Sequence, residues 1–254
     1  MSTDSVRPNI DIREVSTIEE YDACIRLQRE VFGLPDLEIS PRRHLIVSNR
    51  AGGWTLGAFV DGKLIGFVHH LAAVKDDFIF GYSHMMAVDA AFQNKGVGAQ
   101  LKWAQRTRAL NEGRDYIKWT FEPMRARNAH FNLNRLGVVV REYAANFYGT
   151  DYSTDPAEKG SVRGLDSDRL FASWDLKDSR VEAFSRREEF HLGEAERTVE
   201  IPADFASLLK SDPESAKREV QRVRNEFVQT LSEGFVCRAF DRHSERPRYL
   251  FYSS

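Results

Sequence analysis

The sequence predicts a mixed α/β fold, with a run of strands behind two N-terminal helices. Three apolar, β-prone runs follow one another closely, at residues 54–60, 63–71 and 80–88. The apolar spacing then changes to that of a helix over residues 99–110. A chain of 254 residues has room for one large domain and a smaller one. We therefore predict an α+β domain with a mixed sheet over residues 1–177, and a small α+β module packed on it over residues 178–254.

The N-terminal part predicts a strand followed by two helices. Residues 10–15 alternate between apolar and polar side chains, as a half-buried strand does. Thr17 and Glu20 have the spacing of a capping box, which predicts the start of a helix. Ser40 and Pro41 predict a second helix start, because serine is a frequent N-cap residue and proline is favoured at the first helical position.

A hairpin opens the run of strands, and helices and strands alternate after it. Asp61-Gly62 separates the first two strands and favours a type I′ turn. Farther along, residues 116–121 predict a strand and residues 128–136 a short helix. Residues 149–169 are rich in Gly, Ser and Asp and predict a long loop, which leads to a strand at residues 170–174.

The C-terminal module is expected to contain one long helix between short strands. Pro213 follows Ser211 and Asp212, either of which would cap this helix, and Gly234 would end it. Its basic residues alternate with glutamates, which favours a solvated face over a nucleic-acid surface. Strands are predicted at residues 198–201, 235–240 and 249–252.

Composition and charge exclude several classes of protein. Hydrophobic residues make up 42% of the chain and charged residues 29%, which excludes a disordered or collagen-like chain. The formal net charge of −2 gives no broad basic field for nucleic acid. Cys24 and Cys237 have no metal-ligand spacing. Because no apolar run is long enough for a membrane span or a signal peptide, we expect a cytoplasmic protein without a metal, nucleic-acid or membrane partner.

The segment from Val88 to Gly98 carries the clearest chemical signal. It lies between a predicted strand and a predicted helix, and Gly96 and Gly98 are one residue apart. Such glycines let successive main-chain N–H groups turn toward one anion, and the helix N-terminus adds a positive dipole end. A P-loop is excluded because no Gly-Lys-Ser/Thr is present, and a dinucleotide fingerprint because Leu101 replaces its third glycine. The segment predicts a pyrophosphate cradle; a plain turn is the alternative.

The same segment resembles the signature of the GNAT superfamily of acyl-CoA-dependent N-acyltransferases. Their pattern Gln/Arg-x-x-Gly-x-Gly/Ala follows the fourth strand, and residues 93–98 match it, with Val88 and Phe92 at the usual flanking positions. The element order of residues 10–176 also resembles the GNAT fold. The resemblance implies that N–H groups of residues 94–99 hold the CoA pyrophosphate, and that the end of the preceding strand pairs with the pantetheine amides. The implied cofactor-binding residues are Met86, Ala87, Val88, Gln93, Asn94, Lys95, Gly96, Val97, Gly98, Ala99, Asn128 and Asn132.

A narrower resemblance concerns residues 121–124, 127–132 and 164–170. They are similar to a bacterial and archaeal GNAT branch of acetyltransferases, some of which are associated with the succinylation of amino acids. The resemblance implies transfer to a primary amine of a small molecule, such as an amino acid, by direct attack in a ternary complex. The implied acyl donor is acetyl-CoA or succinyl-CoA. The oligomeric state is left open, with a homodimer as one alternative.

His84 and Glu122 are the candidate catalytic residues. Acylation needs a neutral amine, so a base that titrates near pH 7 helps to remove its proton. His84 lies four residues before Val88, a spacing at which the arylalkylamine N-acetyltransferases, another GNAT group, carry a histidine. Glu122 follows a predicted strand where the GNAT fold opens beside the thioester, and would act as a water-linked base or hold the amine. The alternatives are a buried structural histidine and a solvated carboxylate.

The following helix departs from the family pattern. Many GNAT enzymes carry a tyrosine there to protonate the CoA thiolate, and Leu133 occupies that position. Tyr143 and Tyr148 are the candidate substitutes, with buried sheet tyrosines as the alternative, and no acid is assigned. Asn128 and Asn132 are expected on one helix face, with capping by Asn128 as the alternative to contact with pantetheine. The missing tyrosine makes a CoA-binding regulatory protein without catalysis the alternative function.

Two further groups of residues are weighed. His69 and His70 are expected on opposite faces of one strand, so they cannot share a metal ion. Arg163 or Arg169, in the long loop, could hold a substrate carboxylate in a bidentate pair. A plain hairpin loop is the alternative.

Overall fold

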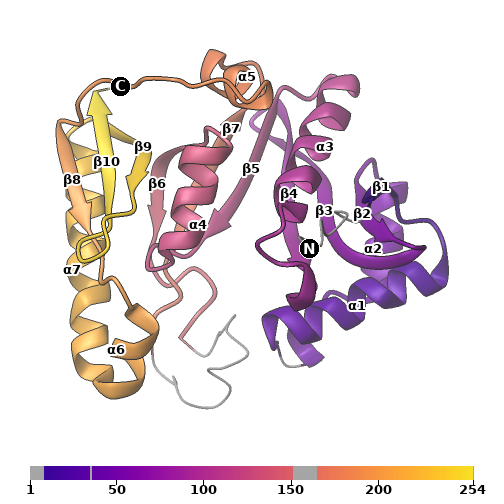
Figure 1. The fold of residues 1–254 in the computed structure, drawn as a ribbon, viewed down its shortest axis with the longest axis horizontal. Coiled ribbons are helices and arrows are strands. Elements are labelled where there is room, and N and C mark those ends of the chain that lie inside the picture. Colours follow the sequence, from indigo (N-terminus) through magenta and orange to yellow (C-terminus); the bar gives the residue numbers. More distant parts are fainter. Residues whose placement is uncertain (1–8, 35, 151–164, 254) are drawn as a thin grey trace, which may run out of the picture. The chain divides into compact units, whose positions relative to one another are not determined.

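A computed structural model describes residues 9–34, 36–150 and 165–253 of the protein (Figure 1). The chain forms two compact units, which divide after residue 112. The domain boundary that the sequence predicts at residue 177 stays a prediction. Arg163 and most of the predicted loop at 149–169 lie outside the described residues.

The first unit contains an antiparallel sheet in the order β1-β2-β3-β4. Its strands are β1 (Asp11–Glu14), β2 (Trp54–Val60), β3 (Lys63–Lys75) and β4 (Phe78–Val88). Its helices are α1 (Ile18–Phe32), α2 (Arg42–Arg50) and α3 (Val97–Asn111), with short 3₁₀ turns η1 (Asp36–Glu38) and η2 (Ala90–Phe92). The predicted strand, two helices and run of strands are confirmed in this order.

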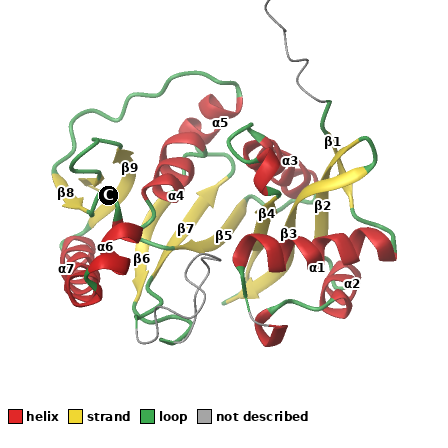
Figure 2. Cartoon of the chain, turned by 60° about the horizontal axis from the view of Figure 1, so that its bottom comes forward, coloured by secondary structure: helices red, strands yellow, loops and turns green. Residues whose placement is uncertain are grey.

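The helices of the first unit cover both faces of its sheet (Figure 2). On one face, α1 and α2 pack over a core that includes Leu45 and Phe67. On the other face, α3 packs over a core that includes Val68 and Leu101. Because Phe67 and Val68 are consecutive residues of β3, the alternation of side chains along the strand supplies both cores.

Two hairpin turns in this unit use backbone of positive φ. The predicted type I′ turn is confirmed at Asp61 and Gly62, whose φ angles are 49° and 76°. Asp76 and Asp77 form a second turn of the same kind, with φ angles of 50° and 60°. Aspartate enters this region more readily than most residues. β3 and β4 are longer than the predicted runs at residues 63–71 and 80–88, because the two aspartates form the turn of one continuous hairpin.

The two N-terminal helices begin in different ways. At α1, Thr17 Oγ1 accepts a hydrogen bond from the Glu20 N–H, and the Glu20 carboxylate accepts one from the Thr17 N–H, both at 3.3 Å. The predicted capping box is therefore confirmed. The N-cap of α2 is Pro41 rather than Ser40. Ser40 does not cap the helix, because its hydroxyl is bonded to the ring of His84.

β4 carries a bulge where it pairs with β3. His69 lies opposite Met85 and His70 lies opposite Ser83, so His84 is an extra residue without a cross-strand partner. An extra residue re-aims the side chains around it. His84 and Met85 therefore both lie on the face of the sheet that α1 and α2 cover.

The second unit contains strands in the order β5-β7-β6-β9-β10-β8. These are β5 (Tyr116–Phe121), β6 (Val139–Ala144), β7 (Arg169–Asp175), β8 (Arg197–Glu200), β9 (Phe235–Asp241) and β10 (Arg248–Ser253). Its helices are α4 (Ala126–His130), which continues as one π-helical segment η3 (Phe131–Arg135), α5 (Ser179–Ser185), α6 (Phe205–Ser211) and α7 (Pro213–Ser232). α7 packs against β6, β8 and β9.

The predicted long helix and final strand pair of this unit are confirmed. α7 begins after Asp212, whose side chain accepts a hydrogen bond from the Ser215 N–H, and Pro213 is its first residue. The sequence analysis missed α5 and α6, which are only seven residues long. Isolated helices of that length are marginal, so their local pattern is weak. No helix of the described residues is both long enough and apolar enough to cross a bilayer.

Candidate functional site

The segment between β4 and α3 has the geometry of a main-chain anion cradle. Asp89 accepts a hydrogen bond from the Ala91 N–H and starts the turn η2. Gln93 Nε2 donates to the carbonyl oxygen of Val88 at 3.0 Å, which ties the loop back to the end of β4. Asn94 then adopts a φ of 61°. The predicted signature glutamine thus holds the loop closed rather than pointing away from it.

Gly96 begins α3 in a conformation that other residues rarely adopt. Its φ is 85°, and it is the N-cap of the helix without a side chain to offer. The first hydrogen bond of α3 runs from the Gln100 N–H to the Gly96 carbonyl oxygen at 3.1 Å. The N–H groups of Val97, Gly98 and Ala99 therefore have no partner within the helix. They lie at its positive dipole end, where an anion is stabilised.

The side chains around the cradle leave it accessible. Lys95 is exposed, with its Nζ 5.5 Å from the centre of the Phe92 ring. Around Gly96, a Cβ would meet no other atom within 4 Å. A Cβ at Gly98 would lie 3.4 Å from the end of the Met86 side chain. The cradle is therefore formed by main chain, with one cation beside it.

The strand end predicted to pair with pantetheine belongs to β4. Met86, Ala87 and Val88 lie opposite Val68, Phe67 and Gly66 of β3. Within the first unit β4 is the last strand of the sheet. The role predicted for these three residues stays a prediction.

His84 lies in a group of three histidines on the α1–α2 face. Its Nε2 is 3.2 Å from the hydroxyl of Ser40, and its ring centre is 5.8 Å from that of His44 and 6.1 Å from that of His69. The side chain keeps accessible surface. Loss of solvent around the ring, and then the charge of His44, lower the pKa of His84 below its usual 6.5. A neutral imidazole at pH 7 is able to accept a proton.

His69 and His70 are both fully buried, on the opposite faces that the sequence predicts. His69 is bonded through Nε2 to Ser48 at 3.0 Å and through Nδ1 to Thr55 at 2.8 Å. Burial lowers the pKa of His69 to about 3. Both ring nitrogens are used, so His69 is a neutral structural residue. Among the described residues, no group of three His, Cys, Asp or Glu is placed to hold a metal ion.

In the second unit, Glu122 lies in a cluster of charged and aromatic side chains. Its carboxylate accepts a hydrogen bond from Arg125 Nε at 2.9 Å and lies 3.9 Å from Arg169 Nη2. The Arg169 guanidinium is buried and lies 5.0 Å from the centre of the Tyr148 ring. Glu122 therefore lies beside two guanidinium groups, as the carboxylate of a charged cluster.

The two asparagines of the next helix have different surroundings. Asn128 is exposed, whereas Asn132 is buried and accepts a hydrogen bond from Trp119 Nε1 at 3.2 Å. The N-cap of α4 is Arg125, so the capping alternative for Asn128 is wrong. The π-helical segment begins at Phe131, between the two asparagines. Only Asn128 therefore offers an accessible side chain to a ligand.

The tyrosines proposed as thiolate acids differ in accessibility. Leu133 is fully buried. The Tyr143 hydroxyl donates to Asp168 at 2.5 Å, and burial followed by this carboxylate raises the pKa of Tyr143 above its usual value. Tyr148 is 46% exposed, and its hydroxyl lies 3.4 Å from that of Thr120. Tyr143 is a poor acid, and Tyr148 is the accessible one.

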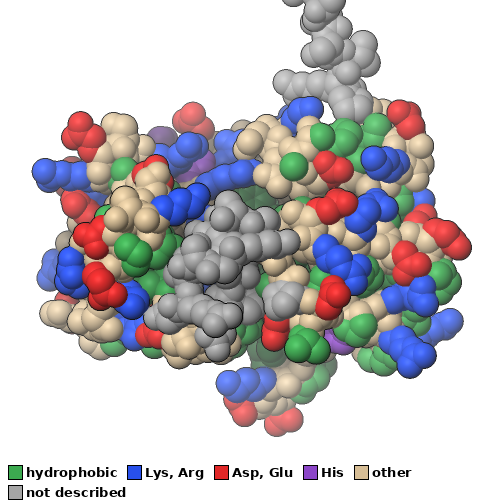
Figure 3. All heavy atoms as spheres, turned by 90° about the horizontal axis from the view of Figure 1, so that it is seen from below, with side chains coloured by type: hydrophobic (Ala, Val, Ile, Leu, Met, Phe, Trp, Pro, Cys, Tyr) green, Lys and Arg blue, Asp and Glu red, His purple; other side chains and the backbone are tan. Residues whose placement is uncertain are grey.

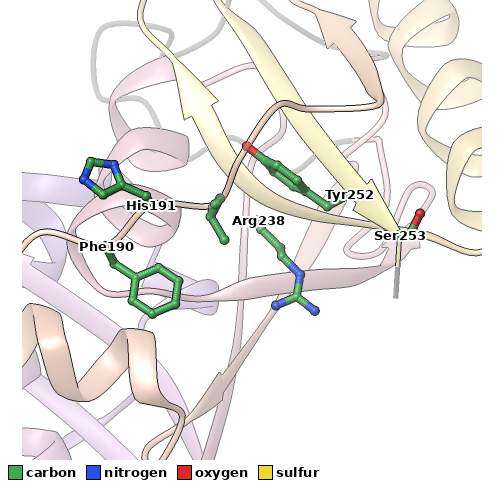
Figure 4. Close-up of a pocket in the computed structure, with 6 residues that line it drawn as sticks. Phe190, His191, Arg238, Tyr252 and Ser253 are labelled. Atoms are coloured by element: carbon green, nitrogen blue, oxygen red, sulfur yellow. The ribbon is translucent and has the colours of Figure 1, made fainter.

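One feature of the second unit was not found from the sequence. A cavity of about 310 Å³ opens beside β9 and β10 (Figure 4). None of the predicted site residues lines it, and its walls come from three separate segments that no sequence motif connects. It is lined by Phe190, His191, Leu192, Arg238, Tyr252 and Ser253. On the face drawn in Figure 3, acidic and basic side chains are intermixed rather than segregated.

The neighbours of His84 were also missed. The sequence analysis interpreted Ser40 only as a helix cap and assigned no role to His44. Both lie about 40 residues before His84 in the chain, and the bulge that brings His84 to them has no sequence signature.

Comparisons with known proteins agree with this architecture. The sequence pattern of the acetyltransferase (GNAT) family matches residues 19–137. The ribosomal-protein-S18-alanine N-acetyltransferase of Escherichia coli has a similar structure, with a TM-score of 0.52, 14% identity and coverage of 66% of this chain and 94% of that one. An N-acetyltransferase of Staphylococcus aureus Mu50 gives a TM-score of 0.51 and 15% identity over 66% and 99% of the two chains.

A chain of the NatC complex, solved with Gag peptide and CoA, gives a TM-score of 0.53 and 15% identity over 66% and 99% of the chains. At such identities these likenesses show the fold. A search of curated proteins found no match to the sequence. The family match and the fold agree with the cradle between β4 and α3. Residues 19–137 of the chain therefore match the acetyltransferase (GNAT) family, whose members transfer acyl groups from acyl-CoA, and the fold agrees with that match.

Proposed function

We propose that this protein is an N-acyltransferase that moves an acetyl or succinyl group from acyl-CoA to the primary amine of a small molecule. An amino acid is the acceptor class that we favour. The reaction is direct attack in a ternary complex. In the described part of the chain both cysteines are buried, and burial raises the pKa of Cys24 to about 12, so neither thiol suits a covalent mechanism.

One observation carries the proposal. The positive φ angles of Asn94 and Gly96 precede an N-terminus of α3 that has no side-chain cap. Main-chain N–H groups from Asn94 to Ala99 would hold the CoA diphosphate there, and Lys95 would add a screened positive charge. Binding the carrier through its diphosphate leaves the thioester free to be positioned against the amine, and such positioning accounts for much of the rate in reactions of this kind.

His84 is proposed as the base. The substrate ammonium loses a proton to His84, directly or through water, and the amine nitrogen then attacks the thioester carbon. The amide C–N bond forms as the C–S bond breaks, the electron pair leaves with the sulfur, and the second proton lost by the nitrogen passes to solvent. Because its pKa lies below 6.5, His84 is neutral at pH 7 and ready to accept the proton.

The leaving thiolate receives its proton from solvent in this proposal. A thiol of ordinary pKa, near 8.5, leaves without an acid more readily than an alcohol does. Leu133 offers no proton, and the hydroxyl of Tyr143 is held by Asp168. Tyr148 is the side chain to test if solvent proves insufficient.

An amino acid acceptor is supported by the charges around Glu122. The Arg169 guanidinium suits a substrate carboxylate, and the Glu122 carboxylate suits a substrate ammonium. The two side chains lie 3.9 Å apart in the second unit. A zwitterion is the ligand that pairs with both.

The test is turnover of acetyl-CoA and succinyl-CoA with a panel of amino acids and simple amines. We expect turnover with amino acids, and a loss of about 10²–10⁴-fold in kcat for His84→Ala at pH 7. The loss should shrink at high pH, where the free amine needs no base. An H84A enzyme with the full rate at every pH would remove His84 from the proposal, and no turnover of any amine would remove the acyltransferase.

A second candidate is a CoA-binding protein without catalysis. The observation that favours it is the buried Leu133 at the position of the family's tyrosine. It predicts tight CoA binding, measured by calorimetry, with no acyl transfer to any amine.

A further inference from the structure

A buried polar network lies on the α3 face of the first sheet. Lys102 of α3 is 3% exposed, and its Nζ donates to Ser83 Oγ at 2.8 Å and to Gln105 Oε1 at 3.0 Å. Gln105 Nε2 lies 3.3 Å from Nδ1 of His70, which is fully buried. The network therefore joins one helix to two strands of the sheet.

Aromatic and charged groups border this network. Trp54 stacks on His70, with ring centres 4.0 Å apart and planes 3° apart. The Arg108 guanidinium lies 4.9 Å from the centre of the Trp54 ring and donates to Glu112 at 3.0 Å. A Cβ at Gly81 would lie 2.0 Å from the His70 ring, so β4 approaches the network closely.

A lysine in this position needs an explanation. Lysine is almost never fully buried unless it is paired, because removing its charge from water is costly. Burial here lowers the pKa of Lys102 well below its usual value. A leucine or methionine would fill the same space at lower cost. The hydrogen-bonding capacity of Lys102 is thus the property that distinguishes it.

Lys102 connects the two parts of the proposed site that lie in the first unit. It is five residues after Val97, where α3 begins behind the cradle. Its partner Ser83 immediately precedes His84, the extra residue of the bulge. A bulge locally disrupts the ladder that would otherwise fix a strand residue. The side-chain bond to Ser83 supplies a fixed point next to that disruption.

We propose that Lys102 is a positioning residue, which holds Ser83 and thereby fixes the bulge that carries His84 relative to the helix behind the CoA cradle. The effect of Lys102 on catalysis rests on the proposed role of His84. Its effect on the bulge does not depend on that role. The groups that face His84 itself are Ser40, His44 and His69. Release of the bulge would move the ring, which is already exposed, away from these neighbours.

The test compares two variants that break the same bond from opposite ends. Lys102→Met keeps most of the length of the side chain without its donors, and Ser83→Ala removes the acceptor with a minimal change of volume. The double variant tests whether the two act through one bond. Thr17→Ala is the matched control, because it weakens the cap of α1 without touching the network.

The first readout is the titration of His84, followed by NMR of its imidazole. We expect its pKa to rise toward 6.5 in K102M and in S83A, and to be unchanged in T17A. The second readout is the pH profile of kcat. We expect kcat at pH 7 to fall by about 10- to 100-fold in each single variant, and no further in the double variant.

The outcomes separate this inference from the proposed function. An unchanged His84 titration in a folded S83A protein overturns the positioning role, whatever happens to K102M. A shifted titration with an unchanged kcat supports the positioning role and removes His84 from catalysis. If K102M and S83A lose as much stability as T17A but change neither the titration of His84 nor kcat, Lys102 only fills space. That outcome overturns the inference.

Discussion

Two segments that look alike as sequence motifs have opposite structures. Residues 93–98 lie in the first unit and the described residues 165–170 in the second. In the sequence, both carry polar and charged side chains beside a glycine, which for the second segment is Gly164. In the first segment the polar main chain at the start of α3 is left open, because Gly96 provides no cap. In the second, the charged side chains form hydrogen-bonded ion pairs with another part of the protein.

The second segment forms a latch to α7. Arg224 donates to Asp166 and to Asp168, each at 2.6 Å. Asp168 also accepts from Tyr143 and from the Asn146 N–H at 2.9 Å. Every strong acceptor of Asp168 is used, so the residue stabilises the fold. The comparison teaches that a motif indicates a ligand site when its polar groups form no hydrogen bonds within the fold. It indicates a structural role when those groups are bonded to other residues of the chain.

The largest expected effect comes from breaking this latch. Asp168→Ala leaves the Arg224 guanidinium partly buried without the two carboxylate oxygens of Asp168, so we expect a loss of about 3–5 kcal/mol in the free energy of unfolding. Urea unfolding measures it. Asp166→Ala is the control, because this carboxylate is 34% exposed and should cost about 1 kcal/mol or less. Equal losses would contradict the assignment of Asp168 as the centre of the latch.

The next effect concerns the open segment. Gly96→Val places a β-branched side chain at a φ of 85°, so the cradle must change its backbone conformation. We expect CoA affinity to fall by about 100-fold or more, which corresponds to about 2.7 kcal/mol. Gly62→Val is the matched control, because Gly62 has a φ of 76° and equally open surroundings in a hairpin turn. Calorimetry should find its CoA affinity unchanged.

A smaller effect is expected at Glu20, which belongs to the cap of α1 and to neither of the two compared segments. The hydrogen bond from Arg13, together with main-chain N–H groups of Ser16 and Thr17, lowers the pKa of Glu20 to about 2 from 4.5. We expect Glu20→Gln to cost about 1–2 kcal/mol at pH 7. Because the native pKa is depressed, this stabilisation is complete above about pH 4.5 and is lost as the pH falls toward 2.

The difference between the wild type and E20Q, measured by urea unfolding across this range, should therefore shrink toward acid. A difference that stays constant with pH would mean that the charge of Glu20 contributes nothing.

The smallest expected effect distinguishes the contribution of the Lys95 side chain to CoA binding from that of the main chain of the cradle. Lys95 is exposed, so its attraction to a diphosphate is screened by water and salt. We expect Lys95→Ala to weaken CoA binding by about two- to fivefold, and the difference to disappear at high salt. A loss as large as that of G96V would show that the charge of Lys95, and not the main chain, holds the cofactor.

The sequence predicted best what depends on the local chain. The turn at Asp61-Gly62, the cap of α7 and the loop at Gly96 follow from conformations that only a few residues adopt, so they can be predicted from neighbouring residues. The second hairpin turn at Asp76 and Asp77 was missed, because two aspartates in this conformation are rarer than Asn-Gly or Asp-Gly.

The surroundings of the site could not be predicted in the same way. Ser40 meets His84 across 44 residues of sequence, through a bulge that no residue type announces. Lys102 is 3% exposed, although a lysine in a polar stretch of an amphipathic helix is expected in solvent. Both contacts depend on how distant elements pack, which a single sequence does not encode locally.

The most direct test of the central claim follows the main-chain amides of residues 94–99 by NMR during titration with CoA, and separately with pantetheine, which lacks the diphosphate. If these N–H groups hold the diphosphate, CoA should shift them strongly and pantetheine should leave them nearly unchanged. If calorimetry shows that CoA binds while the resonances of these amides do not shift, or if pantetheine shifts them as much as CoA does, the cradle is not the binding site.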